Sequence, residues 1–355
     1  MAVLRVRGRA LPDGEPVDLY ADGDRWTDDP VPGATLVAEG WLLPGLVDAH
    51  THPGAERVGL PLDEETLRAD LRGHLDAGVA LIRAPGLAGD GEPPAWFGRD
   101  PDSPRAVHAG PWIAQRGQFF DGWGRRPSLA DLPDVAAAQA ARTGWAKIVV
   151  DWQPEDEVMP VEVLREAVAR VHAVGGRLAV HSQQAAGGVV AVEAGVDSLE
   201  HGMCLDSALL PRMAALGMAL TPTLAAINQS LARRLASPDD AVRTGSYVQG
   251  ASAHGGLVAA AAEAGVTVLA GTDSRPHGRV AGEVRAMVAA GVPSHQALGA
   301  ASWGARAYLG LPGLVAGAPA DAVVYDVDPR DDLGILDHPR AVVLRGRLVR
   351  GRSLL

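Results

Sequence analysis

The chain has 355 residues, and its 32 basic and 43 acidic side chains give a formal net charge of −11. Nucleic-acid binding depends on clustered Lys and Arg, so this acidic balance, in a sequence with no basic tract, argues against a nucleic-acid partner. The first residues alternate charged and apolar side chains and resemble no secretory signal, and no apolar segment is long enough for a membrane span. A single cysteine, Cys204, suits a reducing compartment. We therefore expect a cytoplasmic globular protein that does not bind membranes.

Short apolar runs alternate with longer Ala-rich segments through the middle of the chain. This alternation is typical of βα units around a parallel sheet. Helices are expected at residues 64–77, 161–174 and 207–216. Eight strands are expected, at residues 43–47, 79–83, 106–109, 146–150, 178–180, 196–199, 218–221 and 266–270. Eight units predict an α/β fold of the (β/α)8 TIM-barrel type, with an open doubly wound sheet as the alternative, although the Gly-rich phosphate turn common in that alternative is absent.

The two ends of the chain have a different pattern. Residues 1–44 and 311–355 contain short alternating strands separated by Gly, Pro and Asp. We expect them to pair into a small β-sandwich domain formed from both termini. The barrel would then occupy residues 45–310.

Metal-binding side chains follow several of the expected strands. In a barrel the carboxyl ends of the strands form the active-site face. Alternation along a strand places His50 and His52 on one side, and His181, His201 and Asp273 follow other strands. Each alone is ordinary, since a lone His is often a hydrogen-bonded core residue and an Asp after Gly-Thr is often a helix cap. Together they supply the nitrogen and oxygen donors that zinc prefers.

Lys147 gives an independent signal. It is the only lysine among the 32 basic residues, and it lies within an expected strand. A buried lysine can lose its proton and be modified, whereas arginine stays protonated. A neutral amine at this position could add carbon dioxide and form a carbamate that bridges two metal ions. The alternative is a lysine whose ammonium group reaches water from the strand.

These motifs resemble the metal signatures of the amidohydrolase superfamily. The resemblance is carried by residues 44–52 (PGLVDAHTH), Lys147, His181, residues 198–202 (SLEHG) and residues 271–273 (GTD), and it spans nearly the whole chain. Within the superfamily these contexts look most like the binuclear branch with a carboxylated lysine that contains Xaa-Pro dipeptidases and distant imidazolonepropionase relatives. Residues 81–85 (LIRAP) and 148–152 (IVVDW) depart from the pattern of many relatives.

The resemblance implies a site for two divalent metal ions, most simply Zn²⁺. It assigns His50, His52 and Asp273 to one ion and His181 and His201 to the other, with the carbamate of Lys147 as the bridge. Asp273, Lys147 and His201 are the expected catalytic residues. A hydroxide bridging the ions would attack the carbonyl, and Asp273 would carry the proton to the departing nitrogen.

Substrate contacts are expected from three segments of the chain. All three Phe and three of the eight Trp fall within residues 96–123, where Phe119, Trp123 and Arg116 could form an apolar pocket with a cationic anchor. Packing beneath a long loop is the alternative reading of this cluster. His277, in the loop after the last strand, and Tyr247, in the long connection before it, are further candidates.

The expected function is metal-dependent hydrolysis of an amide bond in a small molecule such as a dipeptide, an N-acyl amino acid or a cyclic amide. Two alternatives stay open: a lactonase or phosphotriesterase that uses the same binuclear site, and a non-catalytic scaffold of the same fold. The sequence does not decide between a monomer and a homo-oligomer.

Overall fold

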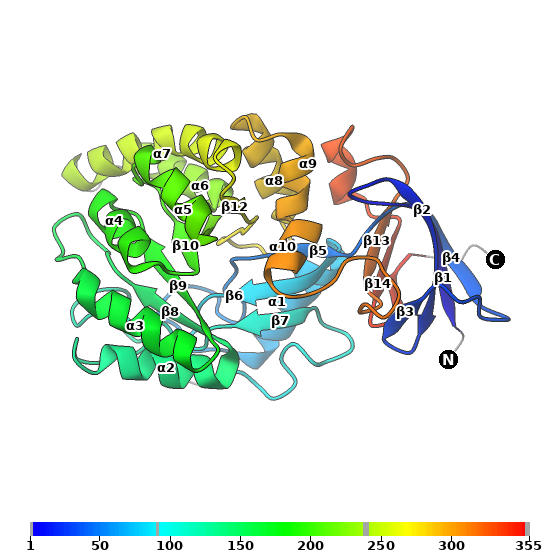
Figure 1. Ribbon diagram of the computed structural model, residues 1–355, viewed down its shortest axis with the longest axis horizontal. Coiled ribbons are helices and arrows are strands. Elements are labelled where there is room, and N and C mark those ends of the chain that lie inside the picture. Colours follow the sequence, from blue (N-terminus) through cyan, green and yellow to red (C-terminus); the bar gives the residue numbers. More distant parts are fainter. Residues whose placement is uncertain (1–2, 90–91, 237–240, 352–355) are drawn as a thin grey trace.

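The computed structural model describes residues 3–89, 92–236 and 241–351, and it has an α/β fold with three sheets (Figure 1). The strands are β1 (Leu4–Ala10), β2 (Glu15–Asp22), β3 (Arg25–Thr27), β4 (Thr35–Leu43), β5 (Leu46–Asp48), β6 (Val79–Ala84), β7 (Arg105–His108), β8 (Trp145–Val149), β9 (Arg177–Ser182), β10 (Ser198–His201), β11 (Ala219–Thr221), β12 (Thr267–Val268), β13 (Ala322–Tyr325), β14 (Ala341–Leu344) and β15 (Arg347–Arg350). The α-helices are α1 (Glu64–Asp76), α2 (Leu132–Thr143), α3 (Val161–Ala173), α4 (Ala185–Ala194), α5 (Leu210–Leu216), α6 (Leu224–Ala236), α7 (Ala241–Glu263), α8 (Val280–Ala289), α9 (Ser294–Ala300) and α10 (Trp303–Tyr308). Short 3-10 helices are η1 (Ser207–Leu209) and η2 (Leu333–Asp337).

Strands from both ends of the chain form one sheet, which lies at the right of Figure 1. Its order is β15-β14-β13-β4-β1-β2-β3, so the pairing gives a single seven-stranded sheet where two stacked sheets were expected. The reason is the long strand β4, which pairs with β1 and also, through Trp41–Leu43, with β13. The close approach of β1 to β4 requires glycine, because a Cβ on Gly8 would lie 1.8 Å from the Gly40 carbonyl oxygen.

The remaining eight strands form two parallel sheets, ordered β5-β6-β7 and β12-β11-β10-β9-β8. Each of the eight overlaps one of the runs expected from the sequence. The first run is divided, since Leu43 ends β4 and a turn at Gly45, with φ of 88°, precedes β5. Parallel strands within a sheet place their carboxyl ends at one edge.

Backbone hydrogen bonds link the two parallel sheets at both sides. Beyond β7, the Ile113 N–H donates to the Lys147 carbonyl over 2.9 Å, which joins this segment to β8. Beyond β5, the Ala49 N–H donates to the Ala270 carbonyl and the Asp273 N–H donates to the His50 carbonyl, each over 2.8 Å. The ladders themselves remain two separate sheets, so the strand pairing alone does not show one closed barrel.

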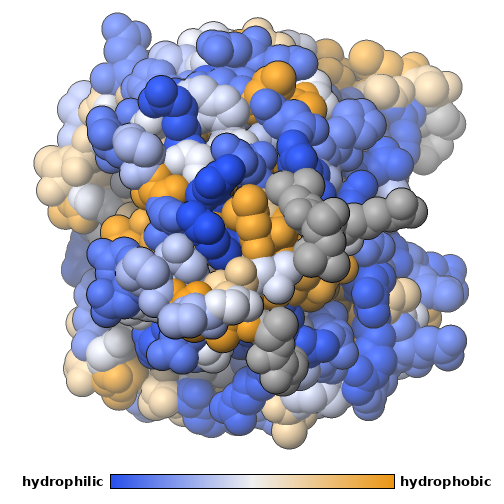
Figure 2. Space-filling model, turned by 90° about the vertical axis from the view of Figure 1, so that its right-hand side faces the viewer, coloured by the Kyte–Doolittle hydropathy of each residue, from blue (hydrophilic) through white to orange (hydrophobic). Residues whose placement is uncertain are grey.

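Helices cover the parallel sheets and lie at the left and centre of Figure 1. The amphipathic helix α3 buries Leu164, Val168 and Val171 in a core cluster that also contains strand residues Ile148 and Val180. Among the helices of the described residues, none is long and apolar enough to cross a membrane. Figure 2 views the molecule from the side of the seven-stranded sheet and shows a mainly hydrophilic face with separate apolar areas.

Candidate metal centre

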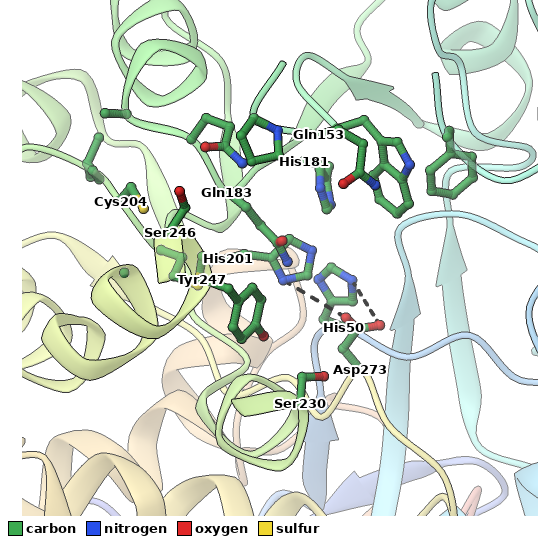
Figure 3. A pocket seen from close by; sticks show the side chains of 18 of the residues that line it. His50, Gln153, His181, Gln183, His201, Cys204, Ser230, Ser246, Tyr247 and Asp273 are labelled. Atoms are coloured by element: carbon green, nitrogen blue, oxygen red, sulfur yellow. Dashed lines mark ion pairs between the residues drawn. The ribbon is translucent and has the colours of Figure 1, made fainter. Parts of the chain in front are cut away.

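The six expected metal ligands line one cavity of about 840 Å³. His50 and His52 follow β5, Lys147 lies within β8, and His181 within β9. His201 ends β10, and Asp273 follows β12. Figure 3 shows His50, His181, His201 and Asp273 pointing toward one another from these different elements. Residues separated by up to 223 positions in the chain therefore share the carboxyl-end edge of the parallel strands.

His50, His52 and Asp273 form the tightest part of this cluster. The Nε2 atoms of His50 and His52 are 3.1 Å apart, and the Asp273 Oδ1 lies 3.3 Å from the His52 Nε2 and 3.7 Å from the His50 Nε2. The His201 Nδ1 is 3.9 Å from the Asp273 Oδ2. Ligand atoms of His50, His201 and Asp273 all lie within 4.8 Å of one another, a separation that one metal ion can span.

Hydrogen bonds on the far side of each ring fix the protonation of these imidazoles. The His50 Nδ1 lies 2.7 Å from the Glu200 Oε2, and the His52 Nδ1 lies 2.7 Å from the Gly86 carbonyl oxygen. A carboxylate and a carbonyl only accept, so each Nδ1 is the donor in its bond and each Nε2 faces the other ligands. Two Nε2 atoms and a carboxylate that face one another, with the far side of each ring held by an acceptor, form the donor set of a metal site.

The backbone at this site is held in uncommon conformations. His201, Thr223 and Asp273 have φ values of 66°, 50° and 44°, in the left-handed region that non-glycine residues rarely adopt. Such positions cluster at functional sites because the surrounding structure must hold them there. Gly271 allows the chain after β12 to approach β5, since a Cβ on Gly271 would lie 2.4 Å from the His50 Cβ.

Lys147 and His181 each bury a polar atom that has no hydrogen-bond partner among the described residues. The Lys147 side chain is 1% exposed, and burial lowers its pKa to about 8 although the carboxylate of Glu200 opposes this shift. Burial and the positive charge of Lys147 lower the pKa of His181 to about 3, which keeps its imidazole neutral. An orphaned amine and an orphaned neutral imidazole fit a centre in which a carbamate and metal ions supply the missing partners.

The carboxyl group of Asp273 is ionised in this environment. Burial by itself raises its pKa, but the facing imidazoles of His50 and His52 outweigh that effect and lower the pKa to about 2. An ionised carboxylate is the form of Asp273 that metal ligation requires.

A buried ion pair that the sequence analysis did not recognise supports His50. The Arg83 Nη2 lies 2.7 and 2.8 Å from the two carboxylate oxygens of Glu200, and the side chains are 1% and 0% exposed. Arg83 also donates to the Ala49 carbonyl and to the hydroxyls of Ser198 and Thr221. Glu200 thus accepts from His50 while Arg83 balances its charge.

The structure places His277 outside the main cavity. Its Nδ1 lies 2.9 Å from the Thr51 Oγ1, and its Nε2 lies 3.4 Å from the Asp70 Oδ2. Asp70 also accepts two hydrogen bonds of 2.7 Å from Arg275, so the loop after Asp273 is attached to α1. Both ring nitrogens of His277 face this network, and the residue lines a second cavity of about 370 Å³. These contacts hold His277 in place beside a cavity that His52, His201 and Asp273 also line, and its expected contact with substrate stays a prediction.

Five aromatic side chains form one side of the main cavity, and we call them the aromatic wall: Trp112, Phe119, Phe120, Trp123 and Trp152. The rings of Trp112 and Trp123 stack with centroids 5.0 Å apart and an angle of 11° between their planes, and Trp152 contacts both Phe residues. The expected residues Phe119 and Trp123 therefore do line the cavity. Trp152, three residues after the end of β8, was not among the expected residues.

The structure does not bring Arg116 to the cavity. Arg116 is exposed and lines neither cavity. The nearby Arg126 donates instead to the backbone carbonyls of Gln118, Phe120 and Trp123, so it holds this loop together. Tyr247, from α7, does line the main cavity, opposite Gln153 in Figure 3.

Comparisons with known proteins agree with this geometry. The amidohydrolase family model matches residues 135–349, which is more than half of the chain. The chain belongs to this family. As an amidohydrolase it is a hydrolase that acts on carbon–nitrogen bonds. An uncharacterized protein of Mycobacterium tuberculosis is 39% identical over 367 residues, which cover 97% of this chain and 95% of that protein.

Solved structures share the amidohydrolase fold with this chain. A prolidase in complex with N-methylphosphonate-L-proline is 21% identical, with a TM-score of 0.82 over 99% of this chain and 100% of the other. A Xaa-Pro dipeptidase with methionine bound in its active site is 20% identical, with a TM-score of 0.79 and the same coverage. At these identities the likeness concerns the fold.

Proposed function

We propose that this amidohydrolase cleaves an amide bond in a small molecule at a centre for two divalent ions, most simply Zn²⁺. His50, His52 and Asp273 would hold one ion, His181 and His201 the other, and a carbamate on Lys147 would join them. The observation that carries the proposal is the convergence of the His50 and His52 Nε2 atoms and the Asp273 carboxylate on a cavity that the buried amine of Lys147 also lines, an amine with no hydrogen-bond partner among the described residues.

When bound, the two ions supply the Lewis acidity that polarises an amide carbonyl and acidifies water. The residues of this chain would then orient the reactants and move the proton. The ionised Asp273 carboxylate would accept a proton from the attacking water and deliver it to the leaving nitrogen, because an amide anion is a poor leaving group. Water is consumed, the C–N bond breaks, and a carboxylic acid and an amine form. Glu200 and Arg83 would hold the His50 ring in its ligating orientation.

We also propose that the two parallel sheets act as one (β/α)8 barrel, comprising residues 45–310, with residues 1–44 and 311–355 forming the small domain. Eight parallel strands and the hydrogen bonds of Ile113 and Ala49 across the two gaps support this description. The solved prolidase and Xaa-Pro dipeptidase, which share the fold, support a dipeptide as the substrate type, and an N-acyl amino acid has the same kind of amide bond next to a free carboxylate.

Turnover of a substrate panel by protein loaded with zinc and bicarbonate tests the proposal. We expect hydrolysis of dipeptides or N-acyl amino acids, loss of turnover on chelation, and recovery with zinc. Turnover of lactones or phosphotriesters without that of any amide would replace the proposal with the lactonase or phosphotriesterase alternative. Protein that keeps well under one ion per chain and hydrolyses nothing would support the non-catalytic scaffold.

A further inference from the structure

The main cavity has two chemically different sides. The aromatic wall supplies one part of its lining, and side chains from helices α6 and α7, among them Ser230, Arg234 and Tyr247, supply another. Figure 3 shows Ser246 and Tyr247 on one side of the metal-ligand cluster and Gln153, which directly follows Trp152, on the opposite side. A molecule that spans the cavity across the cluster would contact both sides.

Among the residues that the structure describes, Arg234 is the only arginine that lines this cavity. Its guanidinium, that of Arg234, lies 4.5 Å from the centroid of the Tyr247 ring. A cation–π contact holds a guanidinium in place without neutralising its charge, so Arg234 still favours an anion. Lys147 also lines the cavity, but its side chain is buried within the metal-ligand cluster.

The aromatic wall suits a flat apolar group. Trp112 and Trp123 are stacked on each other, while Phe119 and Phe120 meet Trp152 at steep angles of 73° and 77°. Aromatic side chains arranged in this way offer both faces and edges to another ring. Phe120 is 38% exposed, so the wall continues to the surface of the molecule.

We propose that the substrate is an N-acyl amino acid with an aromatic acyl group, whose carboxylate binds Arg234 and whose ring lies against the aromatic wall. This inference rests on the proposed function and specifies its substrate class. Both recognition sites line the cavity that holds the metal-ligand cluster, and Arg234 contacts Tyr247, which lies across the cluster from Gln153 in Figure 3. A substrate that occupies both sites would then present its amide bond to the cluster. An arginine can bind a carboxylate through two parallel hydrogen bonds, a geometry that lysine does not reproduce.

Steady-state kinetics on paired substrates test the carboxylate contact. One series has a benzoyl-type group on an amino acid with a free carboxylate, and the other has the same molecules as terminal carboxamides. Arg234→Gln should raise KM about 10- to 100-fold for the free acids, with little change in kcat and none for the carboxamides, because a charged hydrogen-bonded contact is lost. Arg234→Lys should recover part of this loss. Arg212→Gln, at an exposed arginine on α5 that lines neither cavity, is the matched control.

A second variant tests the wall. Phe120→Ala should raise KM for benzoyl substrates several-fold and leave acetyl substrates of the same amino acids unchanged. Binding is measured separately by the quenching of tryptophan fluorescence, since Trp112, Trp123 and Trp152 lie in the wall. Benzoyl amino acids should quench the wild type with a Kd that rises in Arg234→Gln.

The outcomes separate this inference from the proposed function. Equal kcat/KM for free acids and carboxamides, with Arg234→Gln behaving like Arg212→Gln, would overturn the inference while amide hydrolysis stands. Tight, Arg234-dependent binding without turnover of any amide would keep the recognition and overturn the proposed reaction. Equal turnover of benzoyl and acetyl substrates, unaffected by Phe120→Ala, would show that the aromatic wall does not bind the acyl group.

Discussion

Replacing Glu200 by glutamine tests how the structure supports its metal ligands. Glu200 is fully buried, pairs with the equally buried Arg83 and accepts from His50. Glutamine keeps the shape but leaves the guanidinium of Arg83 without a counter-charge, and its amide group must point N–H donors at Arg83 or His50, which are donors themselves. Removing one partner of a buried ion pair costs about 3–5 kcal/mol. We expect the free energy of unfolding of the apo protein to fall by about 3 kcal/mol or more.

Metal affinity should fall in the same variant, because partners of ligating histidines typically contribute about 10- to 100-fold to affinity. Urea unfolding monitored by circular dichroism measures the stability, and competition with a chromophoric chelator measures the affinity for zinc. The matched control is Glu166→Gln, which removes an exposed i,i+4 pair with Arg170 whose side chains are 52% and 42% exposed. Such a surface pair contributes only about 0–1 kcal/mol.

A double variant gives a sharper test of the same pair. Arg83→Met combined with Glu200→Gln removes both charges, so its loss of stability should be smaller than the sum of the two single losses. Our reasoning is refuted if Glu200→Gln is as stable as Glu166→Gln and binds zinc like the wild type.

Four further predictions concern the metal centre and the buried carboxylate of Asp70. Lys147→Arg should abolish turnover while far-UV circular dichroism stays unchanged, since the charge is kept but no carbamate can form; normal turnover would remove the bridging role. Asp273→Asn should lower kcat about 100-fold or more with some zinc retained, as expected for the loss of a general acid–base group, and an unaltered kcat would exclude it as the proton carrier. Removal of zinc by a chelator should lower the free energy of unfolding by about 4 kcal/mol, compared with protein in free zinc at 1,000 times its Kd. A melting temperature that does not change with zinc would contradict the metal centre. Asp70→Asn should cost about 1 kcal/mol at pH 7, because hydrogen bonds from His277 and Arg275 outweigh burial and lower the Asp70 pKa from 3.8 to about 2, while solvent screening weakens the gain. A lowered carboxyl pKa stabilises the fold above pH 4, and this stabilisation is lost as the pH falls toward 2. The difference in unfolding free energy between wild type and Asp70→Asn, measured in urea, should therefore shrink over that range. A constant difference would show that titration of Asp70 does not contribute to stability.

The strands and the positions of the metal ligands could be predicted because both are local features of the sequence. Each of the eight apolar runs carries its own β-branched signal, and His181 directly follows such a run, while His50 and Asp273 lie three residues beyond the ends of theirs. Helices α1 and α3 begin where expected, at residues 64 and 161, and end within one residue of the prediction.

The contacts of side chains distant in sequence could not be predicted. Arg83 and Glu200 are 117 positions apart, and nothing near either residue in the sequence indicates that they meet. The same holds for the arginine at the cavity: Arg116 lies among the aromatic residues of the sequence but points to solvent, whereas Arg234 reaches the cavity from α6. The single terminal sheet depends on β4 pairing on both of its edges, which alternation along one strand does not encode.

The most direct test of the metal centre is a crystal structure of protein prepared with zinc and bicarbonate, with anomalous diffraction recorded on both sides of the zinc absorption edge. Our account predicts two zinc peaks about 3.5–4 Å apart among the six ligands, with continuous density for a carboxyl group on the Lys147 Nζ. A bare Lys147 amine with no zinc peak between His50 and His52 would contradict it.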